Sequence, residues 1–550
     1  VFCSFNNNFK FSEDMFRRWM RILQATPNSV LWLLADNDTA RENMLAAADA
    51  VGVARERLVF APRVAPADYL ARLQLADLFL DTLPYNAHTT ASDALWAGLP
   101  VLTCPGATAQ SRLSASLLRA VGIALQLALV PILAAHWGLE RYGVWGMLIA
   151  LPGILLLSDL GFATAATVRM TMQIARGERE AARTTMHSAS QVVMVACAFI
   201  LLVGFSAATL LPDSAFRAVT ALQAQEVRAA ILWLTVYAIL INGSGLLLAV
   251  FRSNERFAMG SLFSTVTLLL ENGSLVVVVS QGHGLALGAA ALAFGRAGGL
   301  LLAWLAAARL RTGVLPGFWN ADTVVRQNLL GPALAAMAIP LGTTLIIQGQ
   351  VVALGLAAGA AAVPAFVASR TLSRLGLQLG QALAHPLMPE FTAAAARGNH
   401  AVSVRYFAVL LASSLIISAA FAALLALGGT AIVAVWSGGH IIVPHQLMLI
   451  MALAALIGGV WNPLSNLILA VNQQDKFAPA LVILASIGFG VTLALAPFVG
   501  SAGAALTTVA IDLAMLLIVM RFAAANWGTP RVWMQTLRAL ARQVRQELQS

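Results

Sequence analysis

Two groups of residues in this 550-residue chain have side chains and spacings suited to binding a ligand. The first is the loop from Leu80 to Asp93, which places His88, Thr89 and Thr90 where an expected strand ends and an expected helix begins. Free backbone N–H groups at such a point, with two hydroxyls beside them, can hold a diphosphate, and Asp93 can accept a ribose hydroxyl. An alternative needs no ligand, because Thr90 as N-cap and Asp93 at N3 would form a capping pair.

The second group consists of charged residues inside apolar segments, where charge is costly and usually faces an interior cavity. Arg370 and Arg374 are four residues apart and share one helix face, so their guanidinium groups can hold a diphosphate. Snorkelling to a helix end, or pairing with an acid of another segment, explains them equally well. Arg296 and Glu271 stand on neighbouring segments and can neutralise each other, and Asp159 near a segment end fits a structural role slightly better than ion coupling. The candidates for a transport cavity are Asp159, Glu271, Arg296, Arg370, Arg374 and Asp512.

The second group lies in a block of apolar segments between Leu113 and Phe522. A helix that crosses a bilayer needs about 20 mostly apolar residues, and hydrophobic residues make up 59% of the chain against 11% charged. We therefore expect an all-α polytopic membrane domain over residues 113–523. The sequence predicts twelve transmembrane helices, centred near Ala124, Leu155, Ala198, Ile239, Thr267, Ala293, Met337, Ala365, Ile416, Ala454, Ile487 and Thr508.

Residues 1–112 have a different pattern, in which short apolar runs alternate with amphipathic segments. Strands are expected at 1–5, 30–35, 57–61, 78–81 and 100–103, and helices at 12–25, from the capping box Thr39–Glu42, at 66–73 and at 90–98. Such alternation predicts a parallel, doubly wound sheet, here an α/β half-Rossmann lobe that binds ligands at the carboxyl ends of its strands. The fold class is therefore mixed.

An internal repeat divides the membrane domain. The stretch Leu248–Ala258 recurs as Leu469–Ala478, after the fourth and the tenth predicted helices. This placement predicts two six-helix lobes, at about 113–310 and 328–523, related by an axis along the membrane normal. A substrate path between such lobes is the architecture of a transporter.

The distribution of charge predicts the orientation in the membrane. The chain has a net charge of +10, and its Arg residues stand mostly in loops after even-numbered helices, whereas the other side has only Arg141, Arg217 and Arg228. The positive-inside rule then makes the even-numbered loops and both termini cytoplasmic. Because the basic residues lie between spans, we expect no nucleic-acid partner, and three scattered cysteines predict neither a disulfide framework nor a metal site.

Residues 524–550 form a basic amphipathic tail. We expect it to be an interfacial helix on anionic cytoplasmic lipid, although a plain solvated helix is the alternative. Its apolar stripe comprises Trp533, Leu537, Leu540, Val544 and Leu548.

The first 120 or so residues resemble the C-terminal catalytic lobe of bacterial O-linked N-acetylglucosamine transferases. The likeness rests on residues 1–10, 29–34, 57–64 and above all 75–103. It implies UDP-N-acetylglucosamine as a ligand, with Asn7 and Lys10 on the nucleotide and its phosphate. It also implies that the loop residues His88, Thr89, Thr90 and Asp93 hold UDP.

The chain departs from that family in two ways. The helix that usually carries a nucleotide-contacting histidine reads Ala67–Arg72, without one. The N-terminal catalytic lobe and the acceptor-binding repeats are absent, and the chain opens at Val1 inside an expected strand, as if cut from something longer. We therefore assign no catalytic residue and expect at most weak UDP binding.

Residues 113–523 resemble the polysaccharide-export flippases of the multidrug/oligosaccharidyl-lipid/polysaccharide exporter superfamily. Ala134–Gly143 is similar to their first outer loop, and Ser158–Phe162 to the close of their second span. The resemblance implies alternating access that moves an undecaprenyl-diphosphate-linked glycan across the bacterial inner membrane. Other glycan-assembly proteins are further candidate partners.

Three hypotheses follow for the whole chain. In the first it is a flippase for a lipid-linked glycan precursor that carries a vestigial or accessory nucleotide-sugar lobe. In the second it is a membrane-tethered glycosyltransferase whose missing lobe comes from another chain. In the third, two neighbouring reading frames were joined by deletion or assembly error near Leu117–Gly122, where the end of one likeness and the start of the other overlap.

Overall fold

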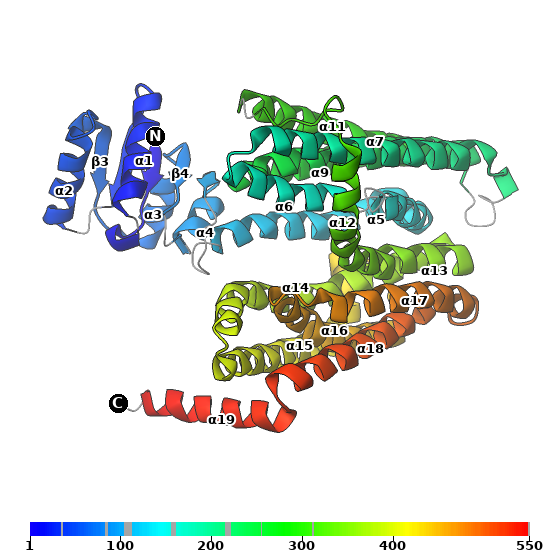
Figure 1. The fold of residues 1–550 in the computed structure, drawn as a ribbon. Coiled ribbons are helices and arrows are strands. Elements are labelled where there is room, and N and C mark those ends of the chain that lie inside the picture. Colours follow the sequence, from blue (N-terminus) through cyan, green and yellow to red (C-terminus); the bar gives the residue numbers. More distant parts are fainter. Residues whose placement is uncertain are drawn as a thin grey trace. The chain divides into compact units, whose positions relative to one another are not determined.

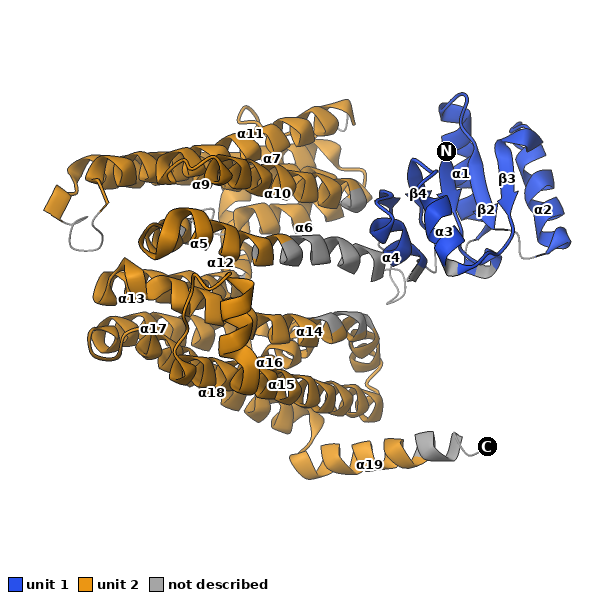
Figure 2. Ribbon diagram, turned by 180° about the vertical axis from the view of Figure 1, so that it is seen from behind, with its two compact units in different colours: residues 1–123 blue, residues 124–550 orange. Residues whose placement is uncertain are grey.

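The computed structural model describes residues 1–550 except 11, 35–36, 83–85, 88, 104–112, 156–160, 215–221, 255, 311–312 and 548–550. The chain divides into two compact units (Figure 2). Residues 1–123 are called the head here, and residues 124–550 are called the membrane unit.

The head contains one parallel five-stranded sheet in the order β3-β2-β1-β4-β5 (Figure 1). The prediction of an α/β lobe is confirmed. The strands are β1 (Phe2–Ser4), β2 (Leu31–Leu34), β3 (Leu58–Ala61), β4 (Leu78–Leu80) and β5 (Val101–Leu102). The helices are α1 (Glu13–Ala25), α2 (Asp38–Asp49), α3 (Pro66–Leu73) and α4 (Thr89–Trp96), with short 3₁₀ turns η1 (Asn8–Lys10) and η2 (Arg55–Arg57).

Both faces of this sheet are covered, since successive strand residues point to opposite sides. On β2, Leu31 and Leu33 join a core with α1 and α2, whereas Trp32 packs against a second core. That second core contains Cys3 and Phe79 with residues of α3 and α4. The two layers of helices hold the strand ends in place.

One predicted cap of the head is wrong. Helix α2 is capped by Asn37, whose Oδ1 accepts a hydrogen bond from the Ala40 amide at 2.7 Å. Thr39 of the expected capping box therefore lies inside the first turn of the helix. The short Asn side chain two residues earlier satisfies the free amide, so the helix begins sooner.

The membrane unit is all-helical (Figure 1). Its first half contains α5 (Leu113–Leu155), α6 (Phe162–Ala175), α7 (Arg179–Leu210), α9 (Ala224–Ser253), α10 (Phe257–Ser280) and α11 (Leu285–Arg309). Its second half contains α12 (Thr323–Thr344), α13 (Gln350–Ala358), α14 (Val363–Ala396), α15 (His400–Trp436), α16 (His445–Ala470), α17 (Ala478–Val499) and α18 (Ser501–Trp527). A π-helical turn η5 (Leu345–Gly349) joins α12 to α13, η6 (Ala360–Ala362) and η7 (Gln474–Lys476) are 3₁₀ turns, and α19 (Pro530–Glu547) follows.

Nine helices in the described part of the chain are long and apolar enough to cross a membrane. They contain nine of the twelve predicted centres, and the other three, Ala124, Leu155 and Ala365, lie on α5 and α14. Helix α5 bends at Gly138, whose φ of 69° suits glycine. The count of twelve stays a prediction, while the chain as a whole is a multi-pass membrane protein.

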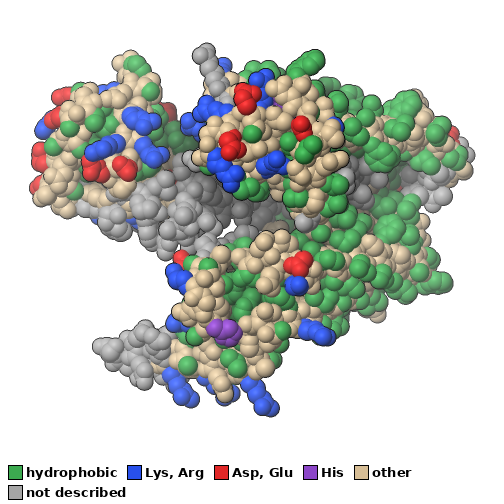
Figure 3. Space-filling model, in the orientation of Figure 1, with side chains coloured by type: hydrophobic (Ala, Val, Ile, Leu, Met, Phe, Trp, Pro, Cys, Tyr) green, Lys and Arg blue, Asp and Glu red, His purple; other side chains and the backbone are tan. Residues whose placement is uncertain are grey.

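The surface of the unit agrees with this assignment. Large apolar side chains such as Leu202, Phe205, Leu427 and Val435 are more than half exposed, as expected where lipid rather than water surrounds a helix. In Figure 3 hydrophobic side chains dominate one end of the helices, and Lys and Arg gather at the other.

The two halves of the unit repeat one packing arrangement. Helix α9 packs against α6, α7 and α11, and helix α16 packs against α14, α15 and α18. We call helices α5 to α11 the N-lobe and helices α12 to α18 the C-lobe. The repeated sequences Leu248–Ala258 and Leu469–Ala478 begin in the last residues of α9 and α16 and run into the next helix, so they occupy the same place in each lobe.

The lobes share a core at one end and have separate cores at the other. A single cluster of buried side chains joins Trp145 and Leu234 of the N-lobe to Leu354 and Phe366 of the C-lobe. Toward the even-numbered loops, one large cluster belongs to the N-lobe and another to the C-lobe, and a small cluster of Phe162, Ala165, Leu329 and Ala333 connects α6 to α12. Helix α12 bridges this end, because its start contacts α6 and α7 and its later part contacts α17.

The apolar stripe predicted on the tail is partly covered by protein. Trp533 is 2% exposed, and its Nε1 donates to the Trp527 carbonyl at 2.8 Å while its ring packs on Phe407 of α15. The expectation that Trp533 faces lipid is therefore wrong, because the turn before α19 folds the helix back onto α15.

The shared core depends on one close approach between the lobes. A Cβ atom on Gly143 of α5 would overlap the carbonyl oxygen of Ala360 in the C-lobe. We expect Gly143→Ala to lower the free energy of unfolding by about 1–3 kcal/mol, the usual cost of overpacking. Thermal unfolding of the detergent-solubilised chain measures it.

Gly428→Ala on α15 is the matched control, since its added Cβ would meet Ile432 only at 3.9 Å. If Gly143→Ala and Gly428→Ala unfold at the same temperature, the close contact of the lobes at Gly143 is wrong.

Candidate functional site

The head has a ligand crevice of the kind found in doubly wound sheets. The chain leaves β1 toward β2 and leaves β4 toward β5, in opposite directions, so the strand order reverses between β1 and β4. Ligands of such sheets bind at this reversal, outside the carboxyl ends of the strands. Residues after β1, residues after β4 and the start of α4 meet there.

Asp81, directly after β4, holds the crevice in shape. Its Oδ1 accepts the backbone amides of Thr82 at 2.7 Å and Ala87 at 2.6 Å. Its Oδ2 accepts Asn86 Nδ2 at 2.6 Å and Thr103 Oγ1 at 2.5 Å. Four bonds to one buried carboxylate fix both ends of the loop that leads to α4.

Thr90 belongs to this crevice rather than to a helix cap. It is the second residue of α4, and its Oγ1 donates to Asn6 Oδ1 at 2.8 Å. The predicted capping pair of Thr90 with Asp93 is therefore wrong. Asn6 is 1% exposed, and its Nδ2 has no hydrogen-bond partner in the described part of the head. A buried amide donor without a partner is unusual, and it marks Asn6 as a residue that could meet a ligand.

Lys10 and Asn7, both predicted from the resemblance, lie after β1 as expected. Burial lowers the pKa of the Lys10 ammonium, and the nearby Asp81 carboxylate acts in the opposite direction. Asn7 Oδ1 accepts Arg63 Nη2 at 2.6 Å. The crevice thus holds a half-buried cation next to amide groups, which suits an anionic ligand.

Tyr69 stands on α3, the helix on which the resembling family usually carries a histidine. Its hydroxyl is buried and has no hydrogen-bond partner among the described residues. Burial, the Asp93 carboxylate and the Cys3 thiol all raise the pKa of Tyr69. The hydroxyl therefore stays protonated next to Asp93, as a donor without an acceptor. His88 and the side chain of Thr89 lie outside the described residues.

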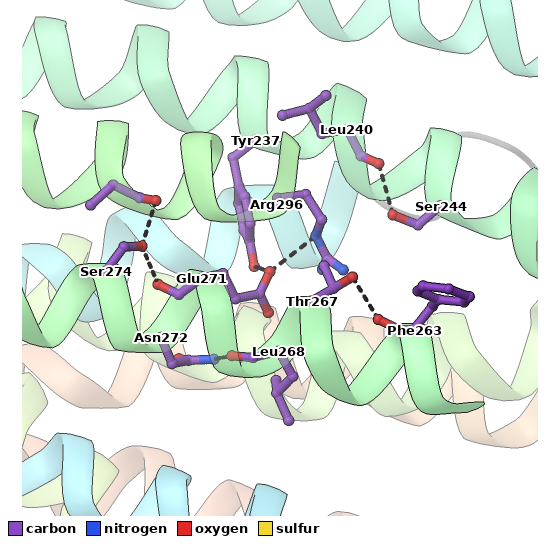
Figure 4. A network of polar contacts seen from close by, with 11 residues as sticks. Tyr237, Leu240, Ser244, Phe263, Thr267, Leu268, Glu271, Asn272, Ser274 and Arg296 are labelled. Carbon is purple, nitrogen blue, oxygen red and sulfur yellow. Dashed lines mark hydrogen bonds and ion pairs between the residues drawn. The ribbon is translucent and has the colours of Figure 1, made fainter. Parts of the chain in front are cut away.

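In the N-lobe, the predicted pairing of Glu271 with Arg296 is present (Figure 4). Arg296 Nε on α11 lies 3.0 Å from Glu271 Oε2 on α10, and the Tyr237 hydroxyl of α9 lies 3.3 Å from the same oxygen. The guanidinium also sits 5.5 Å from the centre of the Tyr237 ring. This buried charge pair is neutral overall, and the cavity next to Arg296 measures only about 40 Å³.

In the C-lobe, Asp512 of α18 is buried and accepts Trp461 Nε1 of α16 at 2.9 Å. Arg374 of α14 is its electrostatic neighbour. Arg374 also lines a cavity of about 170 Å³ between α12, α14, α16 and α17. The sequence reasoning that placed Asp512 and Arg374 inside spans agrees with their burial, while their roles stay predictions.

Arg370, one turn before Arg374, has a different environment. Its Nη1 donates to the Ile347 carbonyl in the π-helical turn, and its guanidinium lies 5.2 Å from the Phe366 ring centre. It is also an electrostatic neighbour of Tyr142, which belongs to the N-lobe. Arg370 therefore lies at the seam between the lobes, whereas Arg374 points into the C-lobe. Asp159 is outside the described residues.

Arg296 and Asp512 occupy equivalent positions in the two lobes. Each is the twelfth residue of the last helix of its lobe, and each of these helices follows a glycine N-cap, Gly284 or Gly500. The two lobes thus carry opposite charges at one repeated position.

The sequence analysis missed several residues of these sites. Asn6 could have been found as the first of the three asparagines after β1. Gln378 and Gln381 stand four and seven residues after Arg374, on one helix face within an apolar span. No sequence pattern marks the other residues of these sites, because only the packing of elements that are distant in sequence brings them there. These residues are Asp81, Tyr237, Trp461 and Asn462.

Comparisons with known proteins relate the two ends of the chain to two different kinds of protein. Residues 1–130 match the model of the family described as glycosyl transferase family 41. Over 123 residues the chain is 37% identical to a UDP-N-acetylglucosamine--peptide N-acetylglucosaminyltransferase of Caenorhabditis elegans and 35% identical to a probable one of Arabidopsis thaliana. These matches cover 22% of this chain but only 11% and 13% of those proteins, so the chain spans about a tenth of its curated relatives.

The membrane unit has the fold of known transporters. An inward-facing multidrug resistance MATE family transporter superposes with a TM-score of 0.61 and 15% identity, covering 73% of this chain and 93% of that one. The lipid II flippase MurJ in an inward closed conformation gives a TM-score of 0.60 at 11% identity, covering 76% and 89%. A glycosyltransferase-like head and a flippase-like membrane unit are therefore joined in one chain.

The buried pair in the N-lobe leads to a prediction. Glu271→Gln leaves the Arg296 charge without its counter-charge, and we expect a loss of about 3–5 kcal/mol in the free energy of unfolding. The double variant Glu271→Leu/Arg296→Met removes both charges and should recover most of it. Unfolding in detergent measures each step.

Asp213→Asn is the control for this prediction, because the Arg228–Asp213 pair is partly exposed and contributes about 0–1 kcal/mol. A double variant that is no more stable than Glu271→Gln would show that the pair is not the source of the loss.

Proposed function

We propose that the membrane unit carries a lipid-linked glycan precursor across a membrane by alternating access. The observation that carries the proposal is the arrangement of the cores, which form one large cluster at one end and, apart from the small cluster between α6 and α12, stay separate at the other. Two lobes that pack together at one end can rock so that they pack together at the other end instead. The path between the lobes then opens to one side of the membrane and afterwards to the other. The similarity to MATE transporters and to a lipid II flippase supports this.

The substrate class rests on the two units together. A flippase-like fold alone suits many amphiphiles, but the same chain carries a glycosyltransferase-like head. An undecaprenyl-diphosphate-linked glycan has a sugar part, which fits the glycosyltransferase-like head, and a lipid part, which fits the flippase-like membrane unit. We assign its diphosphate to Arg370, which lies at the seam and has N–H donors beyond the one given to Ile347.

Orientation follows from the basic loops. The end with separate cores carries Arg176, Arg252, Arg309 and Arg397, so the positive-inside rule makes this end cytoplasmic. The lobes are then joined on the outer side, in an inward-facing state of a bacterial inner-membrane protein. Arg531, Arg538 and Arg542 are exposed on α19, where they suit anionic lipid on the cytoplasmic face.

We infer a second function for the head, the binding of UDP-N-acetylglucosamine. The observation that favours it is the pair of buried donors without partners, Asn6 Nδ2 and the Tyr69 hydroxyl, at the crevice that also holds Lys10. A membrane-tethered glycosyltransferase remains the alternative, with its other catalytic lobe supplied by a second chain. The short overlap with the curated relatives leaves catalysis by this chain alone without support.

Transport is tested in proteoliposomes with a fluorescent undecaprenyl-diphosphate-N-acetylglucosamine, by following the fraction that reaches the outer leaflet. We expect Arg370→Leu to slow transfer about tenfold or more, because the diphosphate loses a charge-assisted contact. Arg370→Lys should retain part of the rate, since lysine keeps the positive charge but lacks the two parallel N–H donors of the guanidinium group.

Arg397→Leu, an exposed arginine between α14 and α15, serves as the matched control and should transfer at the normal rate. The proposal is wrong if the unmodified protein transfers no more lipid than empty vesicles do.

The head is tested by titrating the full chain with UDP-N-acetylglucosamine. We expect saturable binding up to millimolar ligand, weakened about tenfold by Lys10→Ala, which removes a cation from the diphosphate, and weakened also by Thr90→Ala. Arg17→Ala on the exposed side of α1 should bind normally. Equal binding by all four proteins would contradict a nucleotide site at the crevice.

A further inference from the structure

The cavity of the C-lobe differs in chemistry from everything around it. Amide and hydroxyl side chains line it on three helices, in a lobe otherwise packed with apolar residues. Four of them are carboxamides, those of Gln378, Gln381, Asn462 and Asn466. Gln381 Nε2 donates to Asn462 Oδ1 at 2.5 Å, and Gln378 stands one turn before Gln381. Gln378 Oε1 has no hydrogen-bond partner among the described residues. In a membrane helix such groups are costly unless they serve a ligand or a partner.

The charges next to the cavity favour a neutral ligand. Arg374 lines the cavity but is the electrostatic neighbour of Asp512, which is itself held by Trp461 Nε1. A guanidinium balanced in this way attracts an anion weakly. What remains is a set of donors and acceptors without net charge, next to the apolar surfaces of Phe477 and Leu481.

The size of the cavity limits the ligand further. At about 170 Å³ it has room for on the order of ten water-sized groups. That is enough for one sugar ring with its substituents, and too little for a chain of sugars or for a lipid tail. The cavity beside Arg296 in the N-lobe, between α9, α10 and α11, measures only about 40 Å³ and is too small for a sugar ring.

The position of the cavity suits the loading of a substrate. Leu469 and Phe477, at the two ends of the repeated sequence, both line it. They flank the loop that carries Lys476, one of the basic even-numbered loops. The cavity therefore lies toward the end at which the lobes have separate cores.

We propose that the C-lobe cavity holds one N-acetylhexosamine ring of the transported lipid, with Gln378, Gln381 and Asn462 hydrogen-bonded to its hydroxyl and acetamido groups. The N–H groups of the carboxamides can donate to the acetamido carbonyl, and their oxygens can accept from the acetamido N–H. Phe477 and Leu481 offer an apolar surface to the acetamido methyl group. This inference rests on the proposed transport of a lipid-linked glycan. It adds that the protein recognises the sugar, within one lobe, rather than the lipid and diphosphate alone.

The test compares two lipids on the full chain in detergent, undecaprenyl-diphosphate-N-acetylglucosamine and undecaprenyl diphosphate, by quenching of tryptophan fluorescence. We expect the unmodified protein to bind the sugar-bearing lipid about tenfold more tightly. Gln378→Leu, which keeps the size of the side chain but removes its polar atoms, should bind both lipids equally, at the affinity of the sugar-free one. Asn462→Leu should do the same.

Two control variants show whether the preference for the sugar-bearing lipid comes from this cavity. Asn272→Leu makes the same change from amide to leucine on α10, outside the cavity, and should keep the tenfold difference. Arg397→Leu, in an exposed loop outside the cavity, should keep it too. Lys10→Ala tests the head separately, because a loss of the preference in that variant would show that the head recognises the sugar and would overturn the cavity proposal. If Gln378→Leu does not elute as a folded protein, Gln378→Glu replaces it, since a buried negative charge should also abolish the preference.

Each outcome bears on one proposal. If the unmodified protein binds both lipids equally, the cavity proposal is overturned while transport stands. The same holds if Gln378→Leu and Asn462→Leu keep the preference. If neither lipid binds, the proposed transport fails, and the cavity proposal fails with it.

Discussion

A charge or a polar side chain inside a bilayer must find its partner within the protein, because lipid offers none. This constraint explains where the buried charges of the membrane unit stand. In the N-lobe Glu271 forms an ion pair with Arg296 and accepts a hydrogen bond from Tyr237, so that three helices contribute to one neutral group. In the C-lobe Asp512 accepts a hydrogen bond from Trp461, and carboxamide side chains line a cavity of about 170 Å³ nearby.

The head obeys the same constraint through a single carboxylate. Asp81 is buried, and it is stable there because four donors from three segments converge on it. Those donors fix the loop between β4 and α4, which carries the residues expected to hold a nucleotide. Asp81 thus fixes the shape of this region, while two buried donors, Asn6 Nδ2 and the Tyr69 hydroxyl, have no hydrogen-bond partner among the described residues.

The periodicity of apolar residues predicted which helices and strands form. It predicted less well where they end and which residues they contact. The alternation of residues 1–103 predicted all five strands of the head, since successive residues of β1, β2 and β4 pack into opposite cores. It could not predict the cap at Asn37 instead of Thr39, because both residue types are good N-caps and each could accept the amide three residues further on. The spacing of four residues predicted that Arg370 and Arg374 lie on one helix face. It could not predict that Arg370 binds the Ile347 carbonyl of the π-helical turn, whereas Arg374 has Asp512 as its electrostatic neighbour. No local pattern predicts that Asn462 meets Gln381, since 81 residues lie between them.

The asymmetry between the lobes limits the mechanisms available to such a transporter. If both lobes bound the sugar alike, the repeat would place two equal sites on either side of the path, and a single glycan could engage one of them only. Under the two proposals, a sugar site in the C-lobe alone gives the substrate one orientation between the lobes. The sugar would lie in the C-lobe and the diphosphate at the seam near Arg370, about one helical turn from Arg374. In such a rearrangement of the lobes the sugar would move with the C-lobe, and the seam near Arg370 would change its exposure.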